Sequence, residues 1–240
     1  AGVRKLCFSS SAAVYGDNAD IRETAGEAFT EADWNTTSSL EHKPYSYSKT
    51  VAEQEAWKLA EGQDRWTLVT INPSLVLGPG IGGMTASGSF ELMRDLGNGT
   101  LSMGVPLYPF GAVDVREVAE AHLRAGLDES VASGRYILSG HDTDLTELAR
   151  ILRDAFGGRF PLPRRILPKW LVWLAGPFVD ASLTRRVIAR NVGIRARFAN
   201  GKSRRELGIH YRPLEESVIE MFRQMMDSGA FGTNQHSVKP

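Results

Sequence analysis

Two strand-like runs enclose a single long helix-like run in the first third of the chain, and this order most constrains the fold. Residues 3–9 (Val-Arg-Lys-Leu-Cys-Phe-Ser) and residues 66–72 (Trp-Thr-Leu-Val-Thr-Ile-Asn) are rich in apolar and β-branched side chains. Between them, no helix-breaking residue occurs from Tyr45 until Gly62, and Pro44 stands where a first helical turn tolerates proline. The pattern predicts strands at 3–9 and 66–72, a helix over 46–61, and therefore an α/β chain.

The predicted helix carries a tyrosine and a lysine one turn apart. Tyr45 and Lys49 are separated by four positions, which places them on the same face of a helix. A phenol is a weak acid at neutral pH, and a fixed ammonium group beside it favours the phenolate. Such a pair can donate or accept the proton in an alcohol–carbonyl interconversion. The same spacing also arises by chance, with a packed tyrosine and a solvated lysine, so the surrounding sequence has to decide.

The surrounding sequence is specific. The first strand ends in Ser9-Ser10-Ser11-Ala12, and the second leads into Asn72-Pro73-Ser74-Leu75-Val76-Leu77-Gly78-Pro79. Taken in order with Tyr-x-x-Ser-Lys, these motifs resemble the extended branch of the short-chain dehydrogenase/reductase superfamily. That branch includes dihydroflavonol-reductase-like carbonyl reductases and the NAD-dependent nucleotide-sugar epimerases and dehydratases. The resemblance runs from about residue 3 to about residue 229.

The resemblance implies a fold and a division of the chain. We expect the C-terminal portion of a Rossmann-type, doubly wound parallel sheet, with a smaller and mostly helical substrate or lid region. Residues 1–160 would hold the remainder of the Rossmann-type domain and the catalytic helix, residues 161–232 most of the lid, and residues 233–240 a disordered tail. No strand, glycine-rich turn and helix precede Ser11. We therefore expect the N-terminal nucleotide-binding part to be missing, and the chain alone to bind the cofactor poorly.

The resemblance also assigns roles to individual residues. Ser11 would hydrogen-bond the substrate carbonyl, Tyr45 would give it a proton, and Lys49 would support Tyr45 and hold the nicotinamide ribose. The cofactor would be NADP or NAD, which this chain does not distinguish. Besides Tyr45 and Lys49, the residues expected at the cofactor are Ser9, Ser10, Pro73, Leu75 and Val76.

Several functions fit these motifs. The leading prediction is an NAD(P)-dependent carbonyl or aldehyde reductase, or alcohol dehydrogenase, with a small-molecule carbonyl or alcohol as substrate. A nucleotide-sugar epimerase or dehydratase would use the same three catalytic residues, and the Ser-Ser-Ser-Ala-x-Val-Tyr-Gly form leans toward it. The apolar segment 167–178 suggests a 3-beta-hydroxysteroid dehydrogenase as a further alternative. By resemblance, this region also builds the lid over the substrate, so Trp170, Trp173 and Phe178 are candidates for walls of an apolar pocket. The alternative that is not an enzyme is a non-catalytic remnant, which keeps the fold and serves as a binding module.

Composition bears on partners and location. The 28 basic and 28 acidic residues balance, so nucleic acid is not an expected partner. The apolar run 170–175 is too short to span a membrane. The one cysteine, Cys7, cannot form an internal disulfide and suits a reducing, cytoplasmic location. By resemblance, a homodimer through the catalytic helix is possible.

Other segments give local predictions. Residues 78–83 (Gly-Pro-Gly-Ile-Gly-Gly) formally match the dinucleotide fingerprint, but Pro79 lies inside the intended tight turn, so we expect a substrate-side loop instead. Asp114 with Glu117, and Asp144 with Glu147, have the spacing of helix capping boxes. We expect a last helix over 213–228 and interpret Trp34 as an anchor for the polar loop 17–43. The basic cluster of Arg185, Arg186, Arg190, Arg195 and Arg197 is expected to be a solvated face.

Overall fold

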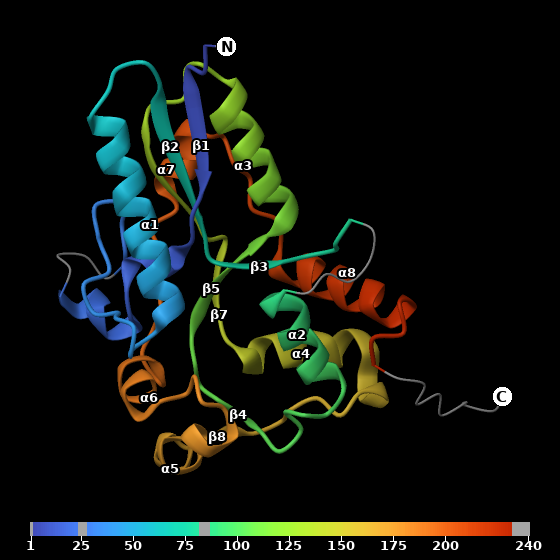
Figure 1. The fold of residues 1–240 in the computed structure, drawn as a ribbon. Coiled ribbons are helices and arrows are strands. Elements are labelled where there is room, and N and C mark those ends of the chain that lie inside the picture. Colours follow the sequence, from blue (N-terminus) through green and yellow to red (C-terminus); the bar gives the residue numbers. More distant parts are fainter. Residues whose placement is uncertain (1, 24–27, 82–86, 232–240) are drawn as a thin grey trace.

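A three-stranded parallel sheet forms the centre of the N-terminal part of the computed structural model, which describes residues 2–23, 28–81 and 87–231 (Figure 1). Its order is β1 (Lys5–Ser9), β2 (Thr67–Pro73) and β6 (Gly134–Leu138). The predicted strands are confirmed. Ser9 pairs with Ile71 and Pro73 with Leu138, so the carboxyl ends of the three strands meet at one edge.

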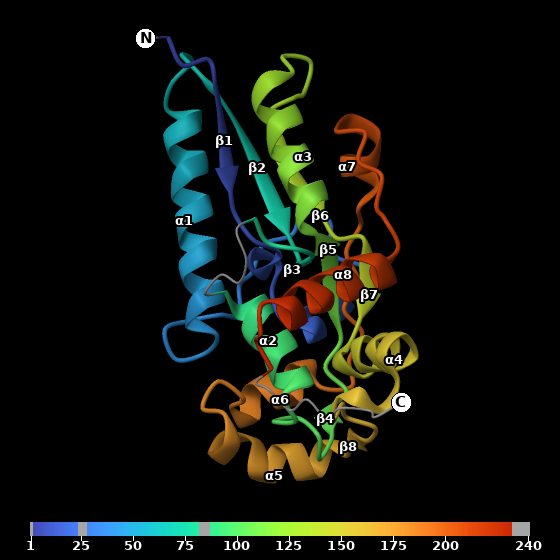
Figure 2. The same ribbon diagram turned by 90° about the vertical axis from the view of Figure 1, so that its right-hand side faces the viewer.

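Helices cover both sides of this sheet. Helix α1 (Pro44–Glu61) joins β1 to β2, and α3 (Val115–Leu127) contacts β1 and β2. In both views α1 and α3 lie on opposite sides of the strands (Figures 1 and 2). The parallel order with helices on both sides confirms the predicted Rossmann-type α/β fold.

The chain leaves the first sheet through Ser74 and enters a second one. Strand β3 (Leu75–Leu77) pairs in parallel with β5 (Phe110–Asp114), which pairs antiparallel with β7 (His141–Thr143). A two-stranded pair, β4 (Val105–Pro106) with β8 (Ile166–Leu167), lies farther from β1 (Figure 1).

The described part of the chain contains six more α-helices and three short 3-10 helices. They are α2 (Gly88–Gly97), α4 (Leu145–Phe156), α5 (Lys169–Val179), α6 (Arg185–Asn191), α7 (Gly201–Glu206) and α8 (Leu214–Asp227), with short 3-10 helices η1 (Ala12–Tyr15), η2 (Asn18–Glu23) and η3 (Gly157–Arg159). The capping box at Asp114 and Glu117 is confirmed, and Asp144 caps α4. Helix α5 continues through Pro177, because a proline in the last turn removes only one hydrogen bond there.

The largest hydrophobic cluster joins the second sheet to α2, α4 and α8. The last helix, α8, buries one apolar stripe in this cluster, with Leu214, Val218, Met221, Phe222 and Met225 all shielded from solvent. Helix α7, although late in the chain, packs against β6 of the first sheet. The boundary near residue 160 stays a prediction, and the expected tail at 233–240 lies outside the described residues.

Candidate active site

The first polar group of the site lies just after β1. Ser11 caps η1, because its Oγ accepts a hydrogen bond from the backbone N–H of Ala13 at 3.2 Å. A hydroxyl used as an acceptor keeps its own proton, which remains available for an oxygen of a ligand. Ser11 is half-buried and lines a cavity of about 290 Å³ together with Pro73, Ser74 and Leu75.

A second cavity, of about 570 Å³, adjoins the first. Tyr45 lines it from the start of α1, and residues 181–184 line it from the segment before α6. The two cavities have three lining residues in common, namely Lys43, Ser46 and Tyr108. Ser11 and Tyr45 therefore lie on neighbouring cavities that share a wall.

Tyr45 and Lys49 lie on successive turns of α1, as their spacing predicts. Tyr45 is 62% exposed and Lys49 is half-buried. Within the described part of the chain, neither side chain forms a hydrogen bond or an ion pair. The phenol and the ammonium group are thus both available to a bound molecule.

Glu53 lies one turn farther along and is fully buried. Its carboxylate accepts hydrogen bonds from Thr70 Oγ1 at 3.2 Å, Asn72 Nδ2 at 2.7 Å, Arg135 Nε at 2.7 Å and Ser10 Oγ. These donors come from β2, from β6 and from the residue that follows β1. Glu53 therefore fastens α1, with Tyr45 and Lys49 on it, to all three strands of the sheet.

Arg135 extends this network to the loop before α1. Its Nη1 donates to the backbone carbonyls of Glu31 at 2.7 Å and Asp33 at 2.6 Å. Its guanidinium lies 3.8 Å from the ring centroid of Trp34, a cation–π geometry. The prediction that Trp34 anchors the loop is confirmed.

A second buried carboxylate, Asp17, holds the start of α1. Its oxygens lie 2.8 Å from His42 Nε2, 3.1 Å from Lys43 Nζ, 2.9 Å from Arg190 Nε and 2.9 Å from Asn191 Nδ2. Burial alone would raise the pKa of Asp17, but the Lys43 charge and the hydrogen bonds hold that pKa well below its ordinary value. The prediction of a solvated face is therefore wrong for Arg190, which also pairs with Asp20.

Lys43 and Tyr108 stand in the wall that the two cavities share. Lys43 is the only non-glycine residue with a left-handed backbone among the described residues, with φ of 53°. Burial raises the pKa of the nearby Tyr108 phenol, and the Lys43 charge opposes the rise. The wall thus carries a cation and a hydroxyl close to Tyr45.

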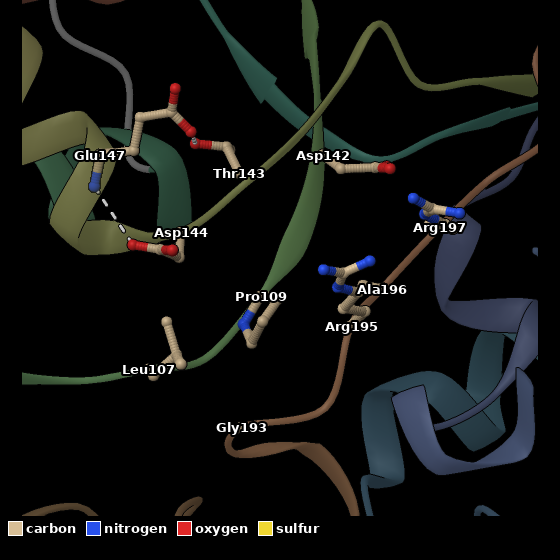
Figure 3. Close-up of a pocket in the computed structure, with 10 residues that line it drawn as sticks. All are labelled: Leu107, Pro109, Asp142, Thr143, Asp144, Glu147, Gly193, Arg195, Ala196 and Arg197. Carbon is tan, nitrogen blue, oxygen red and sulfur yellow. Dashed lines mark hydrogen bonds between the residues drawn. The ribbon is translucent and has the colours of Figure 1, made fainter. Parts of the chain in front are cut away.

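A third cavity, of about 500 Å³, shares Pro109 and Ala196 with the Ser11 cavity. Figure 3 shows Asp142 and Arg197 pointing toward each other across it, while Asp144 caps α4. Burial raises the pKa of Asp142, and the Arg197 charge opposes the rise. Arg195 is exposed, as predicted for the solvated face, whereas Arg197 is half-buried in the wall of this cavity.

The structure brings some of the predicted site residues together and separates others. Ser11, Tyr45, Pro73 and Leu75 line the two adjoining cavities. The residues that line neither are Ser9, Ser10, Lys49 and Val76; Ser10 is buried against Glu53, and Val76 packs beside the core of the first sheet. The catalytic and cofactor roles of all eight stay predictions.

One prediction about the site finds no support in these cavities. Trp170, Trp173 and Phe178 are exposed on α5, and none of them lines the three cavities described above. Sequence reasoning also missed five residues of the site: Asp17, Lys43, Glu53, Tyr108 and Arg135. Of these, Glu53 alone carries a local signal, because it repeats the four-residue spacing of Tyr45 and Lys49.

The parallel sheet, with polar side chains gathered where its strands end, defines an α/β protein of the Rossmann type. The chain belongs to the NAD dependent epimerase/dehydratase family, whose model matches residues 1–137. Among the described residues, no group of three or more His, Cys, Asp or Glu side chains could hold a metal ion.

Relatives are found by sequence and by structure. Cinnamoyl-CoA reductase CAD2 of Medicago truncatula is 30% identical over 199 residues, covering 83% of this chain and 52% of the relative. Gre2 of Candida albicans in complex with NADPH is 27% identical, with a TM-score of 0.68 over 94% of this chain and 64% of that one. Yeast methylglyoxal/isovaleraldehyde reductase Gre2 complexed with NADPH shares the fold, with a TM-score of 0.71 and 24% identity, over 95% of this chain and 65% of that one. The chain thus spans between about half and two thirds of the length of these proteins.

Proposed function

We propose that the protein containing this chain is an NAD(P)-dependent reductase of small carbonyl compounds. The observation that carries the proposal is the placement of Ser11 and Tyr45 on adjoining cavities, with Lys49 one turn from Tyr45. Membership of the family supports it, as do relatives named as reductases. We also propose that the protein is located in the reducing cytoplasm, because the single cysteine, Cys7, cannot form a disulfide within the chain.

The residues around the Ser11 cavity fit a nicotinamide ring and a carbonyl substrate. Pro73, Ser74 and Leu75 offer a largely apolar wall, and Lys49 has no acidic partner in the described ranges that would neutralise it. The cofactor, when bound, supplies the hydride that adds to the carbonyl carbon. NADPH is the first candidate, because it is the cofactor named with both Gre2 structures.

The chain's own residues would carry the proton and orient the substrate. The free hydroxyl proton of Ser11 would hydrogen-bond the carbonyl oxygen, and Tyr45 would donate its phenolic proton to that oxygen as it becomes an alcohol. The Lys49 ammonium would stabilise the phenolate that Tyr45 becomes, and water would then return the proton. One carbonyl is reduced and one nicotinamide is oxidised, so electrons and protons balance.

The test compares Tyr45→Phe with Tyr47→Phe in the full-length natural protein. NADPH oxidation is followed with methylglyoxal, isovaleraldehyde and an aromatic aldehyde. We expect Tyr45→Phe to lower kcat at least about 100-fold, because it removes the proton donor, while NADPH affinity is kept. Tyr47→Phe, two positions along α1, should keep nearly full activity. Equal activity of the two variants would refute the assignment of Tyr45.

The epimerase alternative is separated by the fate of the hydride. A reductase consumes one NADPH for each product, whereas an epimerase returns the hydride and shows no net consumption. Substrate-dependent conversion of a nucleotide sugar without NADPH loss would replace the reductase proposal.

We also propose a homodimer through α1. Val51 and Leu59 lie exposed on this helix, which suits an interface. Light scattering should give twice the monomer mass, and Leu59→Asp should restore the monomer. A wild-type monomer at micromolar concentration would exclude the dimer.

A further inference from the structure

Helix α5 has two apolar sides, and one of them is largely exposed within the described part of the chain. Val172 and Gly176 face the protein, where Val172 packs in a cluster with Ile188 and Val192. The outward stripe consists of Trp170, Trp173, Leu174 and Phe178, at the helical spacing i, i+3, i+4 and i+8. Phe178 is 84% exposed and Trp170 is 68% exposed.

A helix that is apolar on all sides is normally buried, so this exposure calls for a partner. Figures 1 and 2 both place α5 at the periphery, at the end of the molecule away from the amino end of β1. The neighbouring residues Ile166 and Val179 are exposed too and enlarge the apolar surface. We call Ile166, Trp170, Trp173, Leu174, Phe178 and Val179 the α5 surface.

Charge around the α5 surface is one-sided, although the whole chain is neutral. Residues 164–186 contain five basic residues and one acidic residue, Asp180. Arg164, Arg165 and Arg186 are exposed and form no ion pair with any residue that the structure describes. The Arg185 guanidinium lies 4.5 Å from the ring centroid of Trp173, which brings a cation to the edge of the stripe.

We propose that the α5 surface docks on an anionic lipid bilayer. Exposed tryptophan, phenylalanine and leucine side chains, with arginines in the segments before and after the helix, are groups that can anchor a protein at the surface of an anionic membrane. The indole rings would lie at the headgroup level and Phe178 would reach the acyl chains, while the arginines contact lipid phosphates.

Other features agree with surface binding and speak against self-association. No helix in the described residues is long and apolar enough to cross a membrane, so the contact would be peripheral. A symmetric pair of α5 surfaces would bring the same basic rims together, which like-charge repulsion disfavours. Lys169 is not part of the rim, because its Nζ donates to the carbonyls of Ala189 at 3.0 Å and Val192 at 2.7 Å.

The α5 surface is also close to the candidate site in sequence and space. Helix α5 ends at Val179, and residues 181–184 already line the cavity that holds Tyr45. A docked molecule would therefore hold that cavity near the lipid. The docking proposal itself does not depend on the reductase proposal.

The test measures sedimentation of the full-length natural protein with vesicles of phosphatidylcholine alone or with 30% phosphatidylglycerol. We expect binding to the anionic vesicles and at least about ten-fold weaker binding to the neutral ones. Trp170→Ala with Phe178→Ala should weaken binding about ten-fold or more, since the apolar anchors are removed. Arg164→Gln with Arg186→Gln should weaken it several-fold and reduce its salt dependence.

Leu127→Ala is the matched control, because Leu127 is similarly exposed on α3, away from α5. It should bind vesicles like the wild type. Circular dichroism checks that each variant is folded. Equal binding to both vesicle types, unchanged binding of the Trp170 and Phe178 variant, or a dimer that forms through Phe178 without vesicle binding would each overturn the proposal.

Discussion

Glu53 and Asp17 are both buried carboxylates, but their partners differ. Glu53 has one cationic partner, Arg135, which is itself 8% exposed, and its other donors are neutral. Asp17 has two cationic partners, Lys43 and Arg190, whose side chains are 24% and 27% exposed. Glu53 is buried between α1 and the first sheet. Asp17 lies where the loop before α1, the start of α1 and helix α6 meet.

The difference in partners assigns the two carboxylates different roles: Glu53 stabilises the fold, and Asp17 positions the residues of the site. A sealed pair has no water to replace a lost partner, so breaking it leaves an uncompensated charge. Lys43 and Arg190 reach solvent, so the loss of either can be compensated in part by hydration. We therefore expect the Glu53 network to dominate the stability of α1 on the sheet, and Asp17 to hold the start of α1 against α6.

The largest expected effect comes from Arg135→Met. The substitution keeps apolar bulk but leaves the Glu53 carboxylate buried without its cation, so the free energy of unfolding should fall by about 3–5 kcal/mol. The measurement is denaturant unfolding followed by circular dichroism. Glu53→Gln added to Arg135→Met should recover part of the loss, because the stranded charge is removed.

Lys58→Met is the control for Arg135→Met. Lys58 pairs with Glu55 at 2.6 Å on the exposed side of the same helix, and its loss should cost less than about 1 kcal/mol. Similar losses for Arg135→Met and Lys58→Met would contradict the sealed state of the Glu53 network.

A medium effect is expected from pH acting on Asp17. Its pKa is lower in the folded protein than in the unfolded chain, so its stabilisation is complete above the unfolded pKa of about 3.9. The stabilisation is lost as the pH falls below that value toward the folded pKa. Asp17→Asn should be less stable than the wild type at pH 6 by about 2 kcal/mol, with the difference shrinking below pH 4.

Unfolding of wild type and Asp17→Asn between pH 3 and pH 7 checks this. Taking the difference between the two proteins cancels groups with the opposite sign, such as Glu117, whose pKa is raised by burial. A difference that stays constant down to pH 3 would show that Asp17 does not act through its charge.

The sequence could predict the parts of the fold that local rules decide. Runs of apolar and β-branched residues marked β1 and β2, and the carboxylates Asp114 and Asp144 marked the starts of α3 and α4, because a cap acts within one turn. The motif residues Ser11 and Tyr45 were predicted as site residues, and they line adjoining cavities.

The buried ionic networks could not be predicted, because their partners are far apart in the chain. Glu53 and Arg135 are 82 positions apart, and Asp17 and Arg190 are 173 apart. The exposure of α5 was missed for a related reason. Its apolar residues are equally compatible with a pocket wall and with an open surface, and tertiary packing decides between them.

The smallest expected effect concerns the left-handed backbone of Lys43, with φ of 53° and ψ of 61°. We expect Lys43→Gly to be more stable than Lys43→Ala by about 1 kcal/mol, because both lose the ion pair with Asp17 but glycine alone adopts this conformation without strain. At Lys58, inside α1, the order should reverse, since glycine is the poorer helix former by about 1 kcal/mol. Denaturant midpoints of the four variants give both differences. If alanine is the more stable residue at position 43 as well, the backbone there is helical, and the start of α1 is not held in a special conformation by Asp17.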